Sequence, residues 1–205
     1  MSGRLRPIKK GQIILYQGEA AWQIHRLETG LVRAYSILPG GYEFNIALFG
    51  PGDFFPAEVM HESAPATLFY YEAMTDCHAE IISQADFAAS QAADPNVAAS
   101  TAKRYVGALL HINAMGQATA YHKIGHTLRY LAMRFGQPLT GPGFVRIEPR
   151  LTQQDLANLC GISRETASVE LGKLKESGAV TEKSKQYSVH MPSLNKLMGD
   201  NITLE

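Results

Sequence analysis

The segment LTQQDLANLCGISRETASVELGKLKESGAV, at positions 151–180, constrains the fold of this chain most. Thr152 and Asp155 have the spacing of a capping box, which starts a helix. Gly161 suits the end of that helix, because a tight turn needs a positive φ that glycine adopts at low cost. Ser163 can cap a second helix. The pattern therefore predicts two short helices joined by a tight turn.

Apolar spacing indicates which sides of these two helices are buried. The inner positions are Leu156, Leu159, Ala167, Leu171 and Leu174, and Ile162 is placed to fill the angle between the helices. The outward positions near the start of the second helix are Arg164, Glu165, Ser168 and Val169. This is the pattern of a helix-turn-helix, whose second helix enters the major groove of DNA by its amino-terminal end.

The outward residue types suit DNA. Arg164 can contact guanine or a phosphate, and Glu165 can accept a hydrogen bond from the amino group of cytosine. Because phosphates repel an acidic group, Glu165 beside Arg164 favours base recognition; the alternative is that Glu165 only complements the positive helix end. We expect DNA contacts from Thr152, Gln153, Ser163, Arg164, Glu165, Thr166, Ser168, Val169 and Lys185.

A basic hairpin is predicted after this motif. The stretch AVTEKSKQYSVH follows Gly178 and indicates two strands around a turn at Lys183–Lys185. Such a hairpin can touch the phosphate backbone through Lys185, or it can be a solvated turn.

Residues 7–90 are predicted to be β-structure. Stretches rich in Ile, Leu, Tyr and Phe are separated by glycines at short intervals. This spacing is typical of a β-sandwich or barrel.

A long helix is predicted to follow. Asp94 can cap it, with Pro95 at its first position. Small and apolar residues then recur at alternating spacings of three and four: Ala98, Thr101, Tyr105, Ala108, Ile112 and Met115. This period favours a dimer interface formed by Thr101, Tyr105, Ala108, Ile112 and Met115, as in a coiled coil; the alternative is packing on the chain's own barrel.

The domain boundaries follow from these elements. We expect a sensor domain at 1–93, a dimerisation helix at 94–118 and a DNA-binding domain at 119–205. A second helix can start at Thr119 with Ile124, Leu128 and Leu131 on one face. Residues 136–143, GQPLTGPG, are predicted to be a linker.

Composition sets limits on location and class. The formal net charge is zero, which fits DNA binding only if the basic groups gather locally. Two cysteines far apart suit a reducing cytoplasm, and no apolar run is long enough to span a membrane. No apolar segment follows the basic start of the chain, so we expect no signal peptide and a cytoplasmic location.

Together these segments resemble the CRP/FNR family, which includes the cyclic-AMP receptor protein and the fumarate–nitrate reductase regulator. LTQQDLANLCGISRETASVELGKL carries the resemblance most specifically, and the barrel adds Gly11, Gly18-Glu19, Gly30 and Pro51-Gly52-Asp53 in order. The resemblance implies an α+β fold: an N-terminal jelly roll like cyclic-nucleotide-binding domains, a long dimerisation helix and a C-terminal winged helix-turn-helix. It further implies a homodimeric regulator that binds palindromic DNA, contacts RNA polymerase if it is an activator, and is not an enzyme.

By this resemblance, Arg164, Glu165 and Ser168 match base- or phosphate-contacting positions. Members of the family usually carry arginine where this chain has Val169. Valine cannot hydrogen-bond to guanine but can contact a thymine methyl group, so the half-site is expected to differ. Gly172 is also unusual inside a helix.

The sensor domain departs from the cyclic-AMP-binding members. These resemble one another in a Gly-Glu pair that holds the ribose and an arginine, some ten residues later, that neutralises the phosphate. Here Pro56-Ala57 replaces the pair, residues 59–74 contain no arginine, and Ala108 and Leu109 replace hydroxyl residues of the helix. We expect an effector other than cyclic AMP, apolar or aromatic, or none. Candidate pocket residues are Phe55, Pro56, Glu58, Tyr105 and Leu109.

Two alternatives stay open at this point. A one-residue shift could bring Glu58 into the ribose position and restore a response to a cyclic nucleotide. A jelly roll could also be a metal enzyme of the cupin type, but His25, His61 and His78 stand in isolation and the cupin H-x-H pair is absent.

No cofactor or metal is expected. Two cysteines cannot hold the four-cysteine iron–sulfur cluster of some members. Cys77 and His78 are conceivable haem ligands, but Cys77 and Cys160 are more simply packing residues. His122 and His126 have a metal-compatible spacing, yet we expect them on a solvent-exposed helix face.

Overall fold

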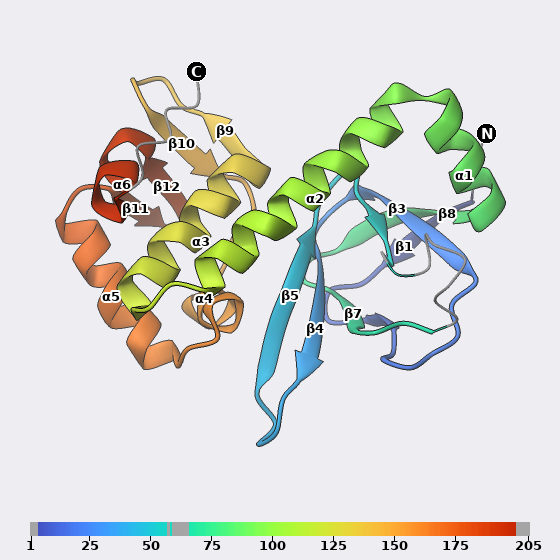
Figure 1. Cartoon of the computed structure of the whole chain (residues 1–205), viewed down its shortest axis with the longest axis horizontal. Helices are drawn as coiled ribbons and strands as arrows, with labels where there is room; N and C mark the ends of the chain where they lie inside the picture. The colour runs from blue at the N-terminus through green and yellow to red at the C-terminus, as the bar shows by residue number, and fades with distance from the viewer. Residues whose placement is uncertain (1–3, 57, 59–65, 200–205) are drawn as a thin grey trace. The chain divides into compact units, whose positions relative to one another are not determined.

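The computed structural model describes residues 4–56, 58 and 66–199. The chain divides into two compact units, Met1–Val106 and Gly107–Glu205, and each is considered by itself (Figure 1).

The first unit is built on a β-roll of two four-stranded antiparallel sheets. One sheet has the order β1-β8-β3-β6 and the other β2-β7-β4-β5. The strands are β1 Arg4–Ile8, β2 Ile13–Leu15, β3 Gln23–Thr29, β4 Val32–Ile37, β5 Glu43–Phe49, β6 Phe54–Phe55, β7 Tyr70–Ala73 and β8 Cys77–Ser83. The predicted jelly-roll architecture is thereby confirmed.

Alternating side chains build the core of the roll. Val32 and Ala34 on β4 point inward, as strand periodicity requires, and join a buried cluster with Phe49, Phe55 and Tyr71. Gly30 is needed in the turn before β4, because it has a φ of 95° and a Cβ there would lie 2.5 Å from the sulfur of Cys77. The glycine turns noted in the sequence thus let the strands close on one another.

Residues 84–90 are helical, so the expectation of β-structure up to residue 90 was wrong. Helix α1 spans Gln84–Ala93, and the Ser83 side chain accepts a hydrogen bond from the Asp86 N–H at its start. Phe87 alone is buried on this helix, where it packs with Ile24 and Phe54. One buried position in ten residues leaves no periodicity that sequence reading could detect.

The long helix α2 spans Pro95–Met115. Its predicted start is confirmed, because the Asp94 carboxylate accepts from the Asn96 N–H at 2.8 Å. The division between the two units falls inside this helix, after Val106.

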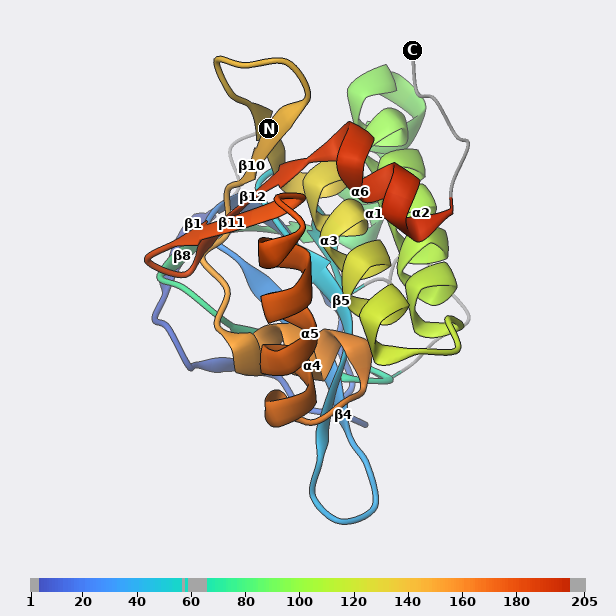
Figure 2. The same cartoon turned by 90° about the vertical axis from the view of Figure 1, so that its left-hand side faces the viewer.

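The second unit packs helices around one small sheet. Its elements are α3 Ala120–Phe135, β9 Gly136–Pro138, β10 Phe144–Ile147, α4 Gln153–Cys160, α5 Arg164–Glu176, β11 Val180–Lys183, β12 Gln186–His190 and α6 Met191–Met198. The sheet has the order β11-β12-β10-β9. Helix α3 contacts α4, α5, α6 and the sheet, so it forms the centre of this unit (Figure 2).

Residues 136–143 are not a plain linker. Gly136–Pro138 forms β9, which pairs antiparallel with β10, so the Gly/Pro-rich stretch supplies a strand and a hairpin turn. Pro138 can sit there because β9 is an edge strand, where a missing N–H costs no ladder bond.

Candidate nucleic-acid interface

The first helix of the predicted motif starts with the expected capping box. The Thr152 hydroxyl accepts from the Asp155 N–H at 3.1 Å, and the Asp155 carboxylate accepts from the Thr152 N–H at 2.7 Å. Gly161 ends α4 with a φ of 61°, in the left-handed region, and donates to the Ala157 carbonyl. These local signals place the turn between α4 and α5 where the sequence predicted it.

Helix α5 is set against the rest of the unit by its apolar side. The Ser163 hydroxyl caps it by accepting from the Thr166 N–H at 3.1 Å. Ala167, Leu171 and Leu174 are buried, as predicted, and α5 packs on α4 and α3 (Figure 2). Packing therefore fixes which side of α5 faces solvent.

The predicted DNA-contacting residues gather on and around the exposed side of α5. Arg164, Glu165, Ser168 and Val169 are exposed, and neither Arg164 nor Glu165 has an ion-pair partner among the residues that the structure describes. The remaining α4 and α5 candidates lie at the two helix starts: Thr152 and Gln153 are half-buried, Ser163 is exposed and Thr166 is half-buried.

The predicted hairpin is present as β11 and β12. Its turn contains Ser184 with a φ of 52° and Lys185 with a φ of 65°, the backbone of a two-residue hairpin loop. The Lys185 carbonyl accepts from the Leu151 N–H at 2.9 Å, and an ion pair joins Lys175 of α5 to Glu182 of β11. These bonds fix the backbone of the hairpin turn relative to α4 and α5, and the Lys185 side chain is exposed there.

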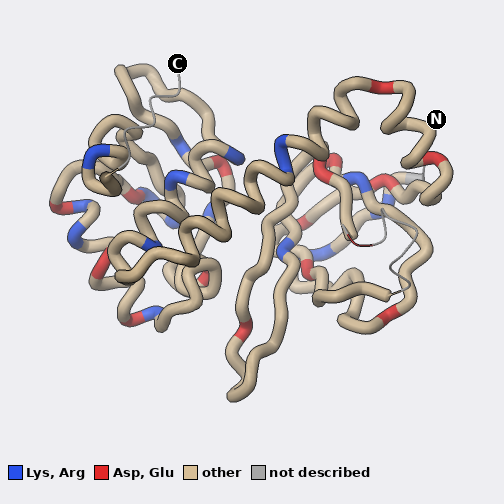
Figure 3. Tube along the Cα trace, viewed as in Figure 1, with Lys and Arg blue, Asp and Glu red and all other residues tan. Residues whose placement is uncertain are grey.

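The net charge of zero conceals a difference between the two units. Residues 107–205 contain eleven lysines and arginines against eight acidic residues, a net of +3, so residues 1–106 carry −3. Figure 3 shows basic and acidic residues interspersed along the trace of both units. The positive excess lies on the unit with the helix-turn-helix, as DNA binding requires.

Helix α2 leaves large apolar side chains exposed. Tyr105, Val106, Leu109 and Ile112 are 65%, 51%, 47% and 66% exposed. Three of the predicted dimer positions, Tyr105, Ala108 and Ile112, are exposed, whereas Thr101 and Met115 are half-buried. We call Tyr105, Val106, Leu109 and Ile112 the α2 ridge.

One contact of α2 was not foreseen. The buried His111 ring lies 2.9 Å from the Leu159 carbonyl through Nε2 and stacks on Tyr130, with ring centroids 5.2 Å apart. Carbonyls in the last turn of a helix lack intrahelical partners, so this imidazole caps the end of α4. Sequence pattern could not reveal it, because the two residues are 48 positions apart.

The candidate effector-pocket residues differ in burial. Phe55 is buried and stacks on His25 and on Tyr71, and Pro56 is also buried. Glu58 accepts from the Leu68 N–H at 2.7 Å and from the Tyr71 hydroxyl at 2.6 Å. Tyr105 and Leu109 lie on the exposed α2 ridge. The replaced position Ala57 lies outside the described residues.

A positive group that no sequence pattern singled out lies near the aromatic core formed by Phe49, Phe55 and Tyr71. The Arg104 guanidinium of α2 is 5.6 Å from the centre of the Phe49 ring. Phe49 in turn packs against Phe55 and Tyr71. A cation therefore approaches the same aromatic cluster from the helix rather than from residues 59–74.

His25 lies inside the roll as a neutral base. Burial, and secondly the charge of Arg6, lower its pKa to about 4. Its Nδ1 atom is buried without a hydrogen-bond partner among the described residues. Stacking on Phe55 holds the ring in place.

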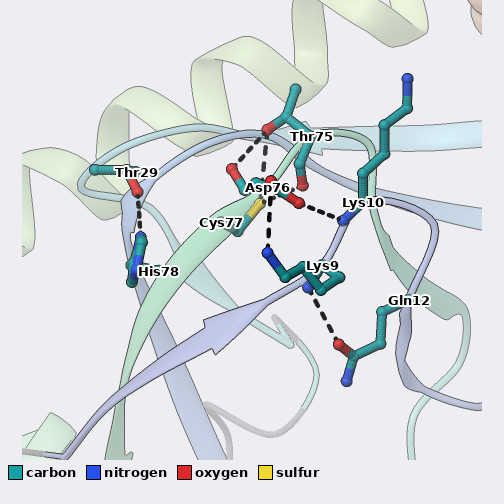
Figure 4. A network of polar contacts seen from close by, with 8 residues as sticks. All are labelled: Lys9, Lys10, Gln12, Thr29, Thr75, Asp76, Cys77 and His78. Atoms are coloured by element: carbon teal, nitrogen blue, oxygen red, sulfur yellow. Dashed lines mark hydrogen bonds and ion pairs between the residues drawn. The ribbon is translucent and has the colours of Figure 1, made fainter.

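Cys77 and His78 have structural partners (Figure 4). The Cys77 thiol is buried and lies 3.2 Å from the Thr75 carbonyl oxygen, and the His78 Nδ1 lies 3.2 Å from the Thr29 hydroxyl. The carboxylate of Asp76 accepts from the Lys10 N–H at 3.0 Å. This network fixes the turn into β8.

The expectation that His122 and His126 share an exposed face was wrong for His126. It is 5% exposed, because α3 is buried continuously over residues 124–132 at the centre of its unit. Burial first, then Arg129 and His122, lower its pKa to about 4. Cys160 is a packing residue, as expected: burial raises its pKa to about 11, and the thiol donates to the Thr127 hydroxyl.

Two further observations bear on class. Within residues 4–56, 58 and 66–199, no three His, Cys, Asp or Glu side chains cluster as metal ligands would. The same residues contain no helix long and apolar enough to cross a membrane. His61 lies outside the described residues.

Family comparisons match both halves of the chain. Residues 5–93 match the model of the cyclic nucleotide-binding domain, and residues 122–199 match that of the Crp-like helix-turn-helix domain. The cyclic AMP receptor protein of Thermus thermophilus is 30% identical over 181 residues, which cover 86% of this chain and 78% of that protein. The nitrogen fixation regulation protein FixK of Rhizobium meliloti is 26% identical over 84% of this chain and 75% of its own length.

Solved structures share the fold. FixK2 from Bradyrhizobium japonicum aligns over 99% of this chain and all of its own, with a TM-score of 0.76 and 24% identity. A CRP-family transcriptional regulator from Thermus thermophilus aligns over 98% of this chain and all of its own, with a TM-score of 0.74 and 21% identity. These likenesses establish the architecture of the chain.

Proposed function

Because this chain belongs to the CRP/FNR family of DNA-binding transcription regulators, which are not enzymes, we propose that it binds an inverted-repeat DNA site as a homodimer. The observation that carries the proposal is the exposed amino-terminal end of α5, where Arg164 and Glu165 stand without ion-pair partners among the described residues. A charged pair held by capping and packing at this end is available to bases and phosphates.

The α2 ridge supports the homodimer. Four large apolar side chains on one helix are exposed in the single chain, and a two-fold contact between copies of α2 would remove them from water. A two-fold dimer presents two copies of α5, so its site is an inverted repeat with half-sites about one helical turn apart.

The proposal also assigns a role to each of the three predicted domains. Residues 1–93 sense an effector, residues 94–118 join the two copies and residues 119–205 bind DNA. If the protein activates transcription, its bound dimer contacts RNA polymerase.

We propose further that cyclic AMP is not the effector, although one relative is named a cyclic AMP receptor protein. The buried Pro56 stands where the ribose-binding pair would be, and no arginine occurs in residues 59–74. Both carboxylate oxygens of Glu58 already accept hydrogen bonds within the chain, one from the Leu68 N–H and one from the Tyr71 hydroxyl. We therefore propose an apolar or aromatic effector, or no effector at all.

A response to a cyclic nucleotide is the second candidate, because two observations favour it. Glu58 is anchored beside the aromatic core and could hold a ribose, and Arg104 lies over Phe49. Titration calorimetry with cyclic AMP separates the two candidates. The Arg104→Ala variant tests whether binding depends on the positive charge of Arg104.

Selection from a random duplex library tests the proposed function. The full-length protein, with and without cell extract to supply an effector, should enrich an inverted repeat. Binding to that repeat should weaken steeply with salt as phosphate contacts release counterions. If no inverted repeat is enriched under either condition, the proposed function is wrong.

A further inference from the structure

Val169 is an apolar side chain on the side of α5 that faces away from the protein. It is 59% exposed. Successive residues of a helix are rotated by about 100°, so Val169 lies about 40° around the axis from Glu165 and one turn further along. The two side chains therefore point to the same side, with Ser168 beside them.

The fold gives no reason for a valine at this position. The buried side of α5 is formed by Ala167, Leu171 and Leu174, and Val169 is not among them. A β-branched residue is also a weaker helix former than arginine, lysine or alanine. Neither packing nor helix propensity accounts for it.

The chemistry of the groove supplies a reason. Valine has no hydrogen-bonding group, so it cannot bind a phosphate or the polar edge of a base. The 5-methyl group of thymine is the apolar feature that the major groove presents. An exposed valine on a DNA-reading helix is complementary to that group.

Gly172 makes the close approach possible. It lies one turn beyond Ser168 and Val169 on the same side of α5, and a Cβ built there meets no atom within 4 Å. The protein thus has room for a side chain at Gly172, and a mid-helix glycine weakens the helix. The missing side chain lowers the surface of α5 next to Val169, so a short side chain can reach a base edge.

We infer that Val169 reads the 5-methyl group of one thymine in each half-site, and that Gly172 permits the close approach this contact needs. The inference rests on the proposed function, since it concerns the same DNA-binding surface.

Thymine-to-uracil substitution tests the contact, because uracil lacks only the methyl group. Using the inverted repeat from the selection, each symmetric pair of thymines is replaced in turn and binding is measured by fluorescence anisotropy. The wild-type protein should lose affinity by about three- to fivefold per half-site at one pair of thymines, the value of about one buried methyl group.

Three variants test the protein side of the contact. Val169→Ala should bind thymine and uracil duplexes equally at that pair. Ile37→Ala, which removes a similarly exposed apolar side chain from β4, should keep the wild-type discrimination. Gly172→Ala should unfold at a higher temperature yet bind the thymine duplex more weakly.

The outcomes separate the two proposals. If the inverted repeat binds but no thymine pair is sensitive to its methyl group, or Val169→Ala keeps the sensitivity, the inference is wrong and the proposed function stands. If no inverted repeat is enriched at all, both are wrong.

Discussion

Replacing Ile112 by glutamate should abolish most of the self-association of this protein. Ile112 is 66% exposed on the α2 ridge. Burying a whole isoleucine side chain is worth about 1.5–3 kcal/mol, so its exposed part contributes about 1–2 kcal/mol in each copy. Two copies meet at a two-fold axis, which makes the loss about 2–4 kcal/mol before any charge effect. Dimer affinity should fall about thirty- to a thousandfold.

The glutamates add to this loss, because two like charges would be desolvated against each other. Sedimentation velocity over a concentration series measures the dimer constant directly. Ile37→Glu is the matched control, because Ile37 is 52% exposed on the β4–β5 hairpin and is not part of the ridge. Circular dichroism should show that both variants remain folded. A dimer constant for Ile112→Glu within threefold of the wild type would refute the assignment of the interface to α2.

Three other outcomes follow from the structure. Folding lowers the pKa of His25 from 6.5 to about 4, so the unfolded chain binds the proton more readily than the folded one. The free energy of unfolding should therefore fall as pH drops below about 6.5. His25 should account for a loss of about 2 kcal/mol between pH 7 and pH 5, measured by urea unfolding. His25→Phe keeps a ring against Phe55 and should remove this part of the pH dependence. An unchanged dependence of the unfolding free energy on pH in this variant would contradict the assignment to His25. Glu165→Ala should cost about 1–3 kcal/mol at one base pair per half-site, whereas Lys185→Ala should weaken binding equally on all sequences; a uniform loss from Glu165→Ala would mean that it only positions the helix. Cyclic AMP at millimolar concentration should give no saturable heat; micromolar binding that strengthens DNA affinity and is lost in Arg104→Ala would establish the cyclic-nucleotide candidate.

The helix-turn-helix could be predicted because its signals are local. The capping box at Thr152, the left-handed Gly161 and the cap at Ser163 each act within four residues of the chain. The hairpin at Lys185 was visible for the same reason. The exposure of Arg164 and Glu165 could be predicted because Leu171 and Leu174 mark the buried side of the same helix.

Other features depend on contacts that are distant in sequence. The bond of His111 to the Leu159 carbonyl and the bond of Glu58 to Tyr71 join residues that no periodicity relates. His126 was expected on the surface because it lies opposite the apolar face of Ile124, Leu128 and Leu131, but α3 is buried over all of residues 124–132. The strand at residues 136–138 was hidden by its glycine and proline.

The decisive comparison is between binding to the intact inverted repeat and binding to a duplex in which one half-site is scrambled. Two chains should bind each intact repeat, and scrambling one half-site should weaken binding by about a hundredfold or more at constant salt. Equal affinity for both duplexes, or one chain per intact site, would contradict the claim that this protein reads palindromic DNA as a dimer.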